Sequence, residues 1–203
     1  MKKVAVIGLG GYGWNFLYNS KGALDLLPLC IDSLSDEGRE RRERLPDIAF
    51  DTTFLESSKS QIAEFVKDLE YVFVVAGLSG SNGGMISTLL EILKECKVLP
   101  ICMLVSPFAG EGESKCKLAQ QRLSEIEKTR GVHIVLSNDL LLKNAKSSMG
   151  MRELYGMQDH AVIAMIESLN ACNSPLVLKD LLRIYDDSIS QNPCLIEKMS
   201  FSF

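Results

Sequence analysis

The chain has 203 residues, of which 46% are hydrophobic and 24% are charged, and its formal net charge is −4 at pH 7. This length and composition are typical of one globular domain with a well-buried core. The small negative charge gives no broad attraction for nucleic acid or for anionic membrane surfaces. No apolar run approaches the roughly 20 residues of a spanning helix, and the N-terminus does not resemble a secretory signal. We therefore expect a cytoplasmic protein with no nucleic-acid partner and no membrane insertion.

The chain begins with a short apolar run and a glycine-rich turn, VAVIGLGGYGWN at residues 4–15. Gly8, Gly10 and Gly13 have the spacing G-x-G-x-x-G. A turn of this kind between a strand and a helix brings backbone amides up to a phosphate, and the helix N-terminus adds a partial positive charge. The turn predicts a phosphate site but leaves NAD, FAD, GTP and ATP open, as well as a tight turn that binds no ligand.

Short apolar runs then alternate with helical patterns. The apolar runs are continuous rather than alternating and cover residues 2–7, 27–31, 70–76, 99–105 and 132–137. The helical patterns cover residues 12–24, 58–68, 84–96 and 112–129. Continuous apolar strands are typical of sheets covered on both faces. We therefore predict an α/β fold with a Rossmann-like, doubly wound and mostly parallel sheet, whose ligands bind at the carboxyl ends of the strands.

Cysteine and histidine offer little for metal or hydrolytic chemistry. The six cysteines include no C-x-x-C pair and are expected to be reduced core thiols. The two histidines, His133 and His160, have neither metal-ligand spacing nor a neighbouring serine or cysteine nucleophile. We predict no metal site built from these side chains.

The apolar run at residues 70–76 leads into a second glycine-rich turn, AGLSGSNGG at residues 76–84, which again precedes a helix. A dinucleotide-binding domain places its pyrophosphate on the first turn and does not need a second. Two turns on one sheet would hold a phosphate chain from two sides, through backbone amides and the hydroxyls of Ser79 and Ser81. This arrangement suits a triphosphate better than a single pyrophosphate. The sequence contains no G-x-x-x-x-G-K-[ST] segment, so we do not expect a P-loop enzyme.

Four stretches in this order resemble the tubulin/FtsZ family: VIGLGGYGWN, YVFVVAGLSGSNGG, VSPFAGEGESK and VLSNDLLL. The resemblance runs from Lys3 to about Arg183. It implies an FtsZ-like, GTP- or GDP-binding domain at residues 1–190 without the family's second domain. Residues 191–203 are then a short C-terminal tail, which is either loose or a strand packed on a sheet edge.

The resemblance also implies which residues contact the nucleotide. The glycine turns would contact the phosphates through Gly10, Gly11, Gly77, Ser79, Gly80, Ser81, Asn82 and Gly83. Glu111 and Lys115 would hold the ribose. The residues that contact the guanine base would be Asn15, Asn138, Tyr155 and Asp159. Tyr155 would stack on the base, and Asp159 would recognise its edge.

The last two base contacts belong to a helix expected at about residues 150–170. Tyr155 and Asp159 are four residues apart and therefore share one helical face, so both can reach one ligand. A carboxylate suits guanine, which presents two N–H donors on its N1/N2 edge. Val162, Ile166 and Leu169 continue the apolar stripe and are expected in the core.

The chain also departs from the family pattern. Asn82 stands at a family threonine and Met85 at a family glycine, and residues 33–53 lack the family's glycine-rich segment over the γ-phosphate. Asp32 matches an acidic position that would serve Mg²⁺ through water. In a dinucleotide site, Asp32 would instead be the acid that binds the ribose. A nicotinamide-dependent oxidoreductase and a ligand-free α/β interaction domain stay open as alternatives.

The family's catalytic loop, N-x-D-x-x-D, acts on the nucleotide site of a neighbouring subunit. Its counterpart here is PLVLKD at residues 175–180, in which only Asp180 keeps an acid. Asp180 is thus the candidate catalytic residue, acting in trans. The resemblance implies self-association or an FtsZ-like partner and a cytoskeletal or regulatory role, and the altered loop predicts that GTP hydrolysis is slow or absent.

Overall fold

The computed structural model describes residues 4–32, 49–51, 59–146, 148–171 and 196–202. Within these residues, seven strands form one sheet in the order β3-β2-β1-β4-β5-β6-β7. Their bounds are β1 Val4–Leu9, β2 Leu26–Asp32, β3 Ala49–Asp51, β4 Tyr71–Gly77, β5 Leu99–Ser106, β6 Gly131–Ser137 and β7 Ile196–Ser202. All neighbouring strands pair in parallel except β6 and β7, which are antiparallel. The predicted α/β fold with a mostly parallel sheet is confirmed.

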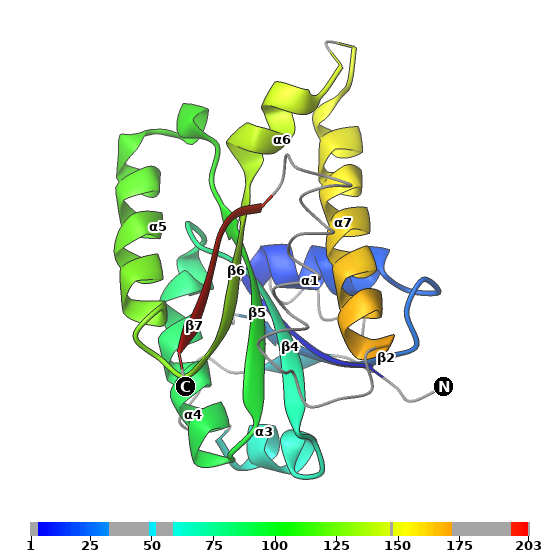
Figure 1. Ribbon diagram of the computed structural model, residues 1–203, viewed down its shortest axis with the longest axis vertical. Coiled ribbons are helices and arrows are strands. Elements are labelled where there is room, and N and C mark those ends of the chain that lie inside the picture. The colour runs from blue at the N-terminus through cyan, green and yellow to red at the C-terminus, as the bar shows by residue number, and fades with distance from the viewer. Residues whose placement is uncertain (1–3, 33–48, 52–58, 147, 172–195, 203) are drawn as a thin grey trace.

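Helices cover both faces of the sheet (Figure 1). They are α1 Gly10–Asn19, α3 Lys59–Val66, α4 Met85–Glu95, α5 Glu113–Ile126, α6 Asn138–Asn144 and α7 Met151–Ala171, with short 3₁₀ helices η2 Ser81–Gly84 and η3 Ala109–Glu111. One core cluster joins α1 and α7 to the sheet, and a second joins α3, α4 and α5 to the opposite face. Because successive side chains of a strand point to opposite faces, Val6 enters the first cluster and Ile7 the second.

The first glycine turn is tighter than the sequence indicates, because α1 begins at Gly10 immediately after β1. Gly10 has a φ of 66°, which favours glycine. A Cβ atom on Gly13 would lie 2.6 Å from the carbonyl oxygen of Val75, and one on Gly8 would lie 2.6 Å from that of Gly13. These glycines therefore allow α1 to pack directly against β1 and β4, which explains the start of the helix two residues earlier than expected.

Other boundaries agree more closely with the sequence. The expected helix at 150–170 is α7, and Val162, Ile166 and Leu169 are buried in the core as predicted. The elements that sequence patterns missed are β3 and α6, whereas β7 is the edge strand that was one of the two alternatives for the C-terminal segment. Helix α6 has only seven residues, and its N-cap is Ser137, whose hydroxyl accepts a hydrogen bond from the Leu140 N–H. One short capped turn is too brief for a helical period to stand out.

The end of the described chain is an edge strand rather than a loose segment. Strand β7 pairs with β6 from Gly131 to Leu136, with an irregularity between Val135 and Leu136. Glu127, at the end of α5, accepts hydrogen bonds from Lys198 and from the Ser200 hydroxyl. The position of the domain boundary at residue 190 stays a prediction, because residues 172–195 lie outside the described part of the chain.

None of the described helices combines the length and the apolar character that a membrane span requires. The cysteines in the described part of the chain are free thiols: Cys30 and Cys102 are buried, and Cys96 and Cys116 are half-buried. Burial raises the pKa of Cys102 well above its usual range, which disfavours its thiolate form.

Candidate functional site

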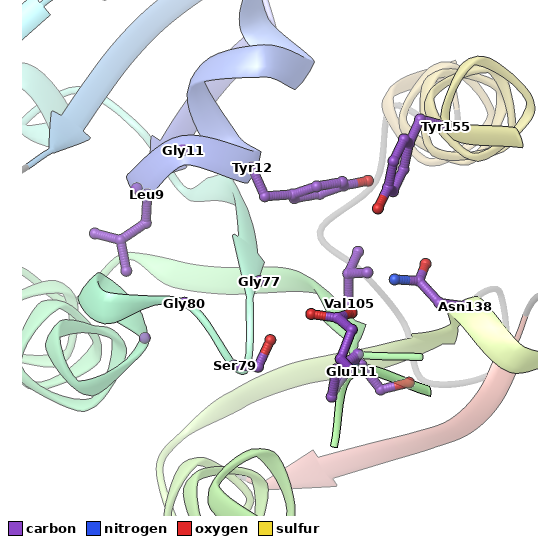
Figure 2. A pocket seen from close by; sticks show the side chains of 14 residues that line it. Leu9, Gly11, Tyr12, Gly77, Ser79, Gly80, Val105, Glu111, Asn138 and Tyr155 are labelled. Carbon is purple, nitrogen blue, oxygen red and sulfur yellow. The ribbon is translucent and has the colours of Figure 1, made fainter. Parts of the chain in front are cut away.

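The two glycine-rich turns meet at one end of the sheet. Strands β1 and β4 are parallel neighbours, so the turns that follow them leave the sheet side by side. They border a pocket of about 280 Å³, shown in Figure 2. Its lining residues are Leu9, Gly10, Gly11, Tyr12, Gly77, Ser79, Gly80, Gly83, Val105, Ser106, Pro107, Glu111, Asn138 and Tyr155. We call this cavity the glycine pocket.

A larger cavity of about 760 Å³ lies next to the glycine pocket, between α1 and α7. Tyr12 and Tyr155 line both cavities, so the two share a wall. The larger cavity is also lined by Asn15, Asn19, Met151, Arg152, Gly156, Asp159, His160 and Ile163. We call it the helix pocket. A ligand with a phosphate end and a ring end therefore finds a space for each in adjacent cavities.

Tyr12 stands between these cavities and was not among the predicted site residues. Figure 2 shows its ring reaching from α1 toward Tyr155 on α7. Within the described residues, its buried hydroxyl has no hydrogen-bond partner. Burial raises the pKa of Tyr12 well above its usual range, and the charge of Asp159 adds to this effect. No sequence signal distinguishes this tyrosine from a core aromatic, because only the tertiary structure places it at the shared wall.

Asp159 is a buried carboxylate in the wall of the helix pocket, with 6% of its surface exposed. One of its oxygens accepts a hydrogen bond of 2.7 Å from the side-chain amide of Asn19. Burial raises the pKa of Asp159, although the Asn19 hydrogen bond and the nearby His160 act in the opposite direction. A carboxylate in this environment gains from further N–H donors, because burial without partners is costly.

Asn138 reaches the glycine pocket from the start of α6 and is held by a residue that sequence patterns missed. The side-chain amide of Gln158 on α7 donates a 2.8 Å hydrogen bond to the Asn138 oxygen, and both residues are buried. This bond orients the Asn138 side chain, which lies beside Tyr155 and Val105 in Figure 2. The bond uses the Asn138 oxygen and not its amide nitrogen. Gln158 therefore orients one of the predicted site residues.

Glu111 and Lys115 come together as their spacing predicts. One Glu111 oxygen accepts a 3.0 Å hydrogen bond from Lys115, and the other accepts one of 3.0 Å from the Phe108 N–H. Glu111 lines the glycine pocket, whereas Lys115 does not. The Phe108 contact shows that Glu111 stabilises the 3₁₀ turn η3 at the same time as it faces the pocket.

The remaining predicted residues divide into four groups. Asn15 lies at the helix pocket, away from the glycines. Asp32 ends β2, is almost fully buried and lines neither pocket. The described residues contain no group of three or more His, Cys, Asp or Glu that could hold a metal ion. Ser81 and Asn82 belong to the backbone turn η2, and Asp180 lies outside the described residues.

Comparison with known proteins gives a consistent result. The model of the Tubulin/FtsZ family, GTPase domain, matches residues 48–146. The cell division protein FtsZ of Helicobacter pylori is 28% identical over 189 residues, covering 83% of this chain and 49% of that protein. The mitochondrial division protein fszB of Dictyostelium discoideum is 31% identical over 124 residues, covering 59% of this chain and 34% of that protein. The chain thus spans about half the length of the first of these relatives and about a third of the second.

Solved structures show the same fold. An empty FtsZ dimer of M. jannaschii has a TM-score of 0.66 and 21% identity, covering 83% of this chain and 54% of that chain. GDP-bound monomeric CetZ1 of Haloferax volcanii has a TM-score of 0.62 and 17% identity, covering 83% and 60%. The family model, the related sequences and the solved structures all point to the same family as the paired glycine turns. In sequence and in fold, the chain is thus similar to the Tubulin/FtsZ family.

Proposed function

We propose that this chain binds a guanine nucleotide, GDP or GTP, with the phosphates in the glycine pocket and the base in the helix pocket. The observation that carries the proposal is the meeting of two glycine-rich turns on one cavity. The glycines that present backbone without side chains are Gly10 and Gly11 at the start of α1, Gly77 at the end of β4 and Gly80 in the turn that follows β4. The helix start adds a partial positive charge, which favours phosphate.

The helix pocket supports a base rather than a second phosphate. Its wall combines the half-exposed ring of Tyr155 with the buried carboxylate of Asp159, one helical turn further along α7. An aromatic face suits stacking on a base, and a carboxylate accepts the two N–H donors of guanine. Adenine presents a different edge and would leave the buried carboxylate without donors. CetZ1, which shares this fold, was solved with GDP bound.

Calorimetric titration of one preparation with GDP, GTP, ATP and NAD tests the proposal. We expect GDP and GTP to bind at least about tenfold more tightly than ATP, because one unpaired polar edge in a buried site is worth about 1 kcal/mol or more. Tightest binding of NAD would instead support the nicotinamide-dependent oxidoreductase that the first glycine turn leaves open. Binding of none of the four would favour a ligand-free interaction domain.

Magnesium, ribose contacts and partners are further parts of this proposal. Glu111 would accept hydrogen bonds from the ribose hydroxyls, and Lys115 would hold the Glu111 carboxylate in place. Mg²⁺ would be bound mainly by the phosphates and by water, because Asp32 lies outside both pockets. Asp32 would contact the ion only through a water molecule.

An FtsZ of the same fold was solved as a dimer. We propose that this chain likewise associates with itself or with an FtsZ-like partner, in a cytoskeletal or regulatory role.

We also propose that the isolated chain hydrolyses GTP slowly. Water attack on the γ-phosphate needs a group that orients the water, and Asp180 is the one acid kept in the segment that resembles the family's catalytic loop. Binding depends on the two pockets and can persist without turnover. Phosphate release should stay near background and should not rise steeply with protein concentration. Rapid release that increases with concentration and is lost in Asp180→Ala would contradict this expectation and show that one acid suffices in an assembly.

A further inference from the structure

Arg122 contacts the second glycine turn but does not line the glycine pocket. It projects from α5 and is absent from the pocket lining. One of its guanidinium nitrogens, Nη1, donates hydrogen bonds of 2.7 Å to both the Leu78 and the Gly80 carbonyl oxygens. The same nitrogen lies against Gly83, where a Cβ atom would collide with it. The guanidinium therefore fits against this turn only because position 83 has no side chain.

These two hydrogen bonds set the direction of two peptide groups. The described peptide bonds are all trans, and in a trans peptide the C=O and the following N–H point in opposite directions. With the Leu78 and Gly80 carbonyls turned toward Arg122, the N–H groups of Ser79 and Ser81 are turned away from it. Because Ser79 lines the glycine pocket and Arg122 does not, an N–H of Ser79 that is turned away from Arg122 is available on the pocket side of the turn. Within the described residues, no hydrogen bond occupies the Ser79 N–H.

We propose that Arg122 is the residue that holds the second glycine turn in its anion-binding orientation, so that backbone N–H groups face the phosphates of the nucleotide. This inference rests on the proposed guanine-nucleotide function and adds a positioning residue to it. Without Arg122, both carbonyls lose their charged donor. The Gly80 carbonyl keeps the Gly83 N–H at 3.0 Å, so the peptide group between Leu78 and Ser79 gains the most freedom to turn. An outward-facing carbonyl repels phosphate, whereas an outward-facing N–H binds it.

The charge of Arg122 acts in the same direction. Within the described residues, its hydrogen bonds go to the carbonyl oxygens of Leu78 and Gly80, so its positive charge lies directly behind the turn. Phosphates on the other side of the turn would experience a favourable potential. Arg122 would therefore affect the phosphate end of a nucleotide and leave the base end unchanged, because Tyr155 and Asp159 lie on α7.

Binding of GDP and of guanosine to the same set of variants tests this inference. Arg122→Met keeps an apolar stem of similar length but removes both hydrogen bonds and the charge. Arg122→Lys keeps the charge and a nitrogen that can donate to both carbonyls. Lys117→Met is the matched control, because it removes a positive charge from the same helix at an exposed position. Circular dichroism and urea unfolding check that each variant folds. If Arg122→Met does not fold, Arg122→Gln, which has one amide donor group, takes its place.

We expect Arg122→Met to weaken GDP binding about tenfold or more. Guanosine should bind equally to all variants, Arg122→Lys should recover most of the GDP affinity, and Lys117→Met should match the unmodified protein. Unchanged GDP affinity in Arg122→Met, a parallel loss of guanosine affinity, or no recovery in Arg122→Lys would each overturn the inference while leaving the proposed function intact. If the unmodified protein binds neither ligand, the proposed function fails, and the role of Arg122 fails with it.

Discussion

Replacing Asp159 with asparagine should weaken GDP binding about a hundredfold and should make xanthosine diphosphate the preferred nucleotide. The carboxylate lies in the wall of the helix pocket, one turn along α7 from Tyr155. Its two oxygens can accept both N–H donors of guanine. An asparagine offers one acceptor and places its own N–H donors against the guanine amino group, which leaves buried donors unpaired.

The xanthine base explains the expected change of preference. Xanthine carries a carbonyl oxygen where guanine carries the amino group, so its edge presents one donor and one acceptor. These match the acceptor and the donor of an asparagine side chain. The substitution hardly changes the volume, and the side-chain oxygen of the introduced asparagine can still accept the hydrogen bond that Asn19 donates to Asp159 at 2.7 Å.

Titrations of Asp159→Asn with GDP and xanthosine diphosphate measure both effects. Glu167→Gln is the matched control, because it removes a carboxylate from an exposed position on the same helix. It should bind GDP as tightly as the unmodified protein. If Asp159→Asn also binds GDP normally, Asp159 does not read the base edge, and the contact with Asn19 is its main role.

The second large effect concerns stability in acid. His133 lies in β6 with no exposed surface, and within the described residues neither ring nitrogen has a hydrogen-bond partner. Burial lowers the pKa of His133 from 6.5 to about 4, although the charge of Glu127 opposes the shift. The folded protein therefore keeps this side chain neutral, whereas the unfolded chain binds a proton near pH 6.5.

The sign of the effect follows from these two pKa values. At pH 7 both states are neutral at this position, so the contribution of His133 to stability is fully present. As the pH falls from about 6.5 toward 4, the unfolded state binds the proton first and is stabilised. The free energy of unfolding should fall by about 3 kcal/mol across this range, because each unit of pKa difference corresponds to about 1.4 kcal/mol.

Urea unfolding of the unmodified protein and of His133→Leu at several pH values measures this contribution. The leucine variant should lose about 3 kcal/mol less between pH 7 and pH 4, because it has no group to protonate at this position. His160→Gln, at an exposed position, is the control and should keep the loss of about 3 kcal/mol that the buried His133 contributes. Parallel curves for the unmodified protein and His133→Leu would show that His133 is not held neutral in the folded state.

Local sequence patterns determined a large part of this structure. Continuous apolar runs marked β1, β2, β4, β5 and β6, because strands covered by helices on both faces need apolar side chains in succession. The glycine turns after β1 and β4 were visible for a similar reason, since turn chemistry depends on adjacent residues. Tyr155 and Asp159 were placed on one helical face by their spacing alone, and both line the helix pocket.

Contacts between distant residues were decided only by the tertiary structure. Arg122 reaches the second glycine turn 42 residues away, and Gln158 reaches Asn138 20 residues away, so no local period connects them. Tyr12 becomes a wall shared by two pockets only when α1 and α7 pack on the same face of the sheet. Strand β7 likewise required the edge of β6 for its pairing. Sequence patterns thus identified residues that line the two pockets, whereas long-range packing determined which residues orient them.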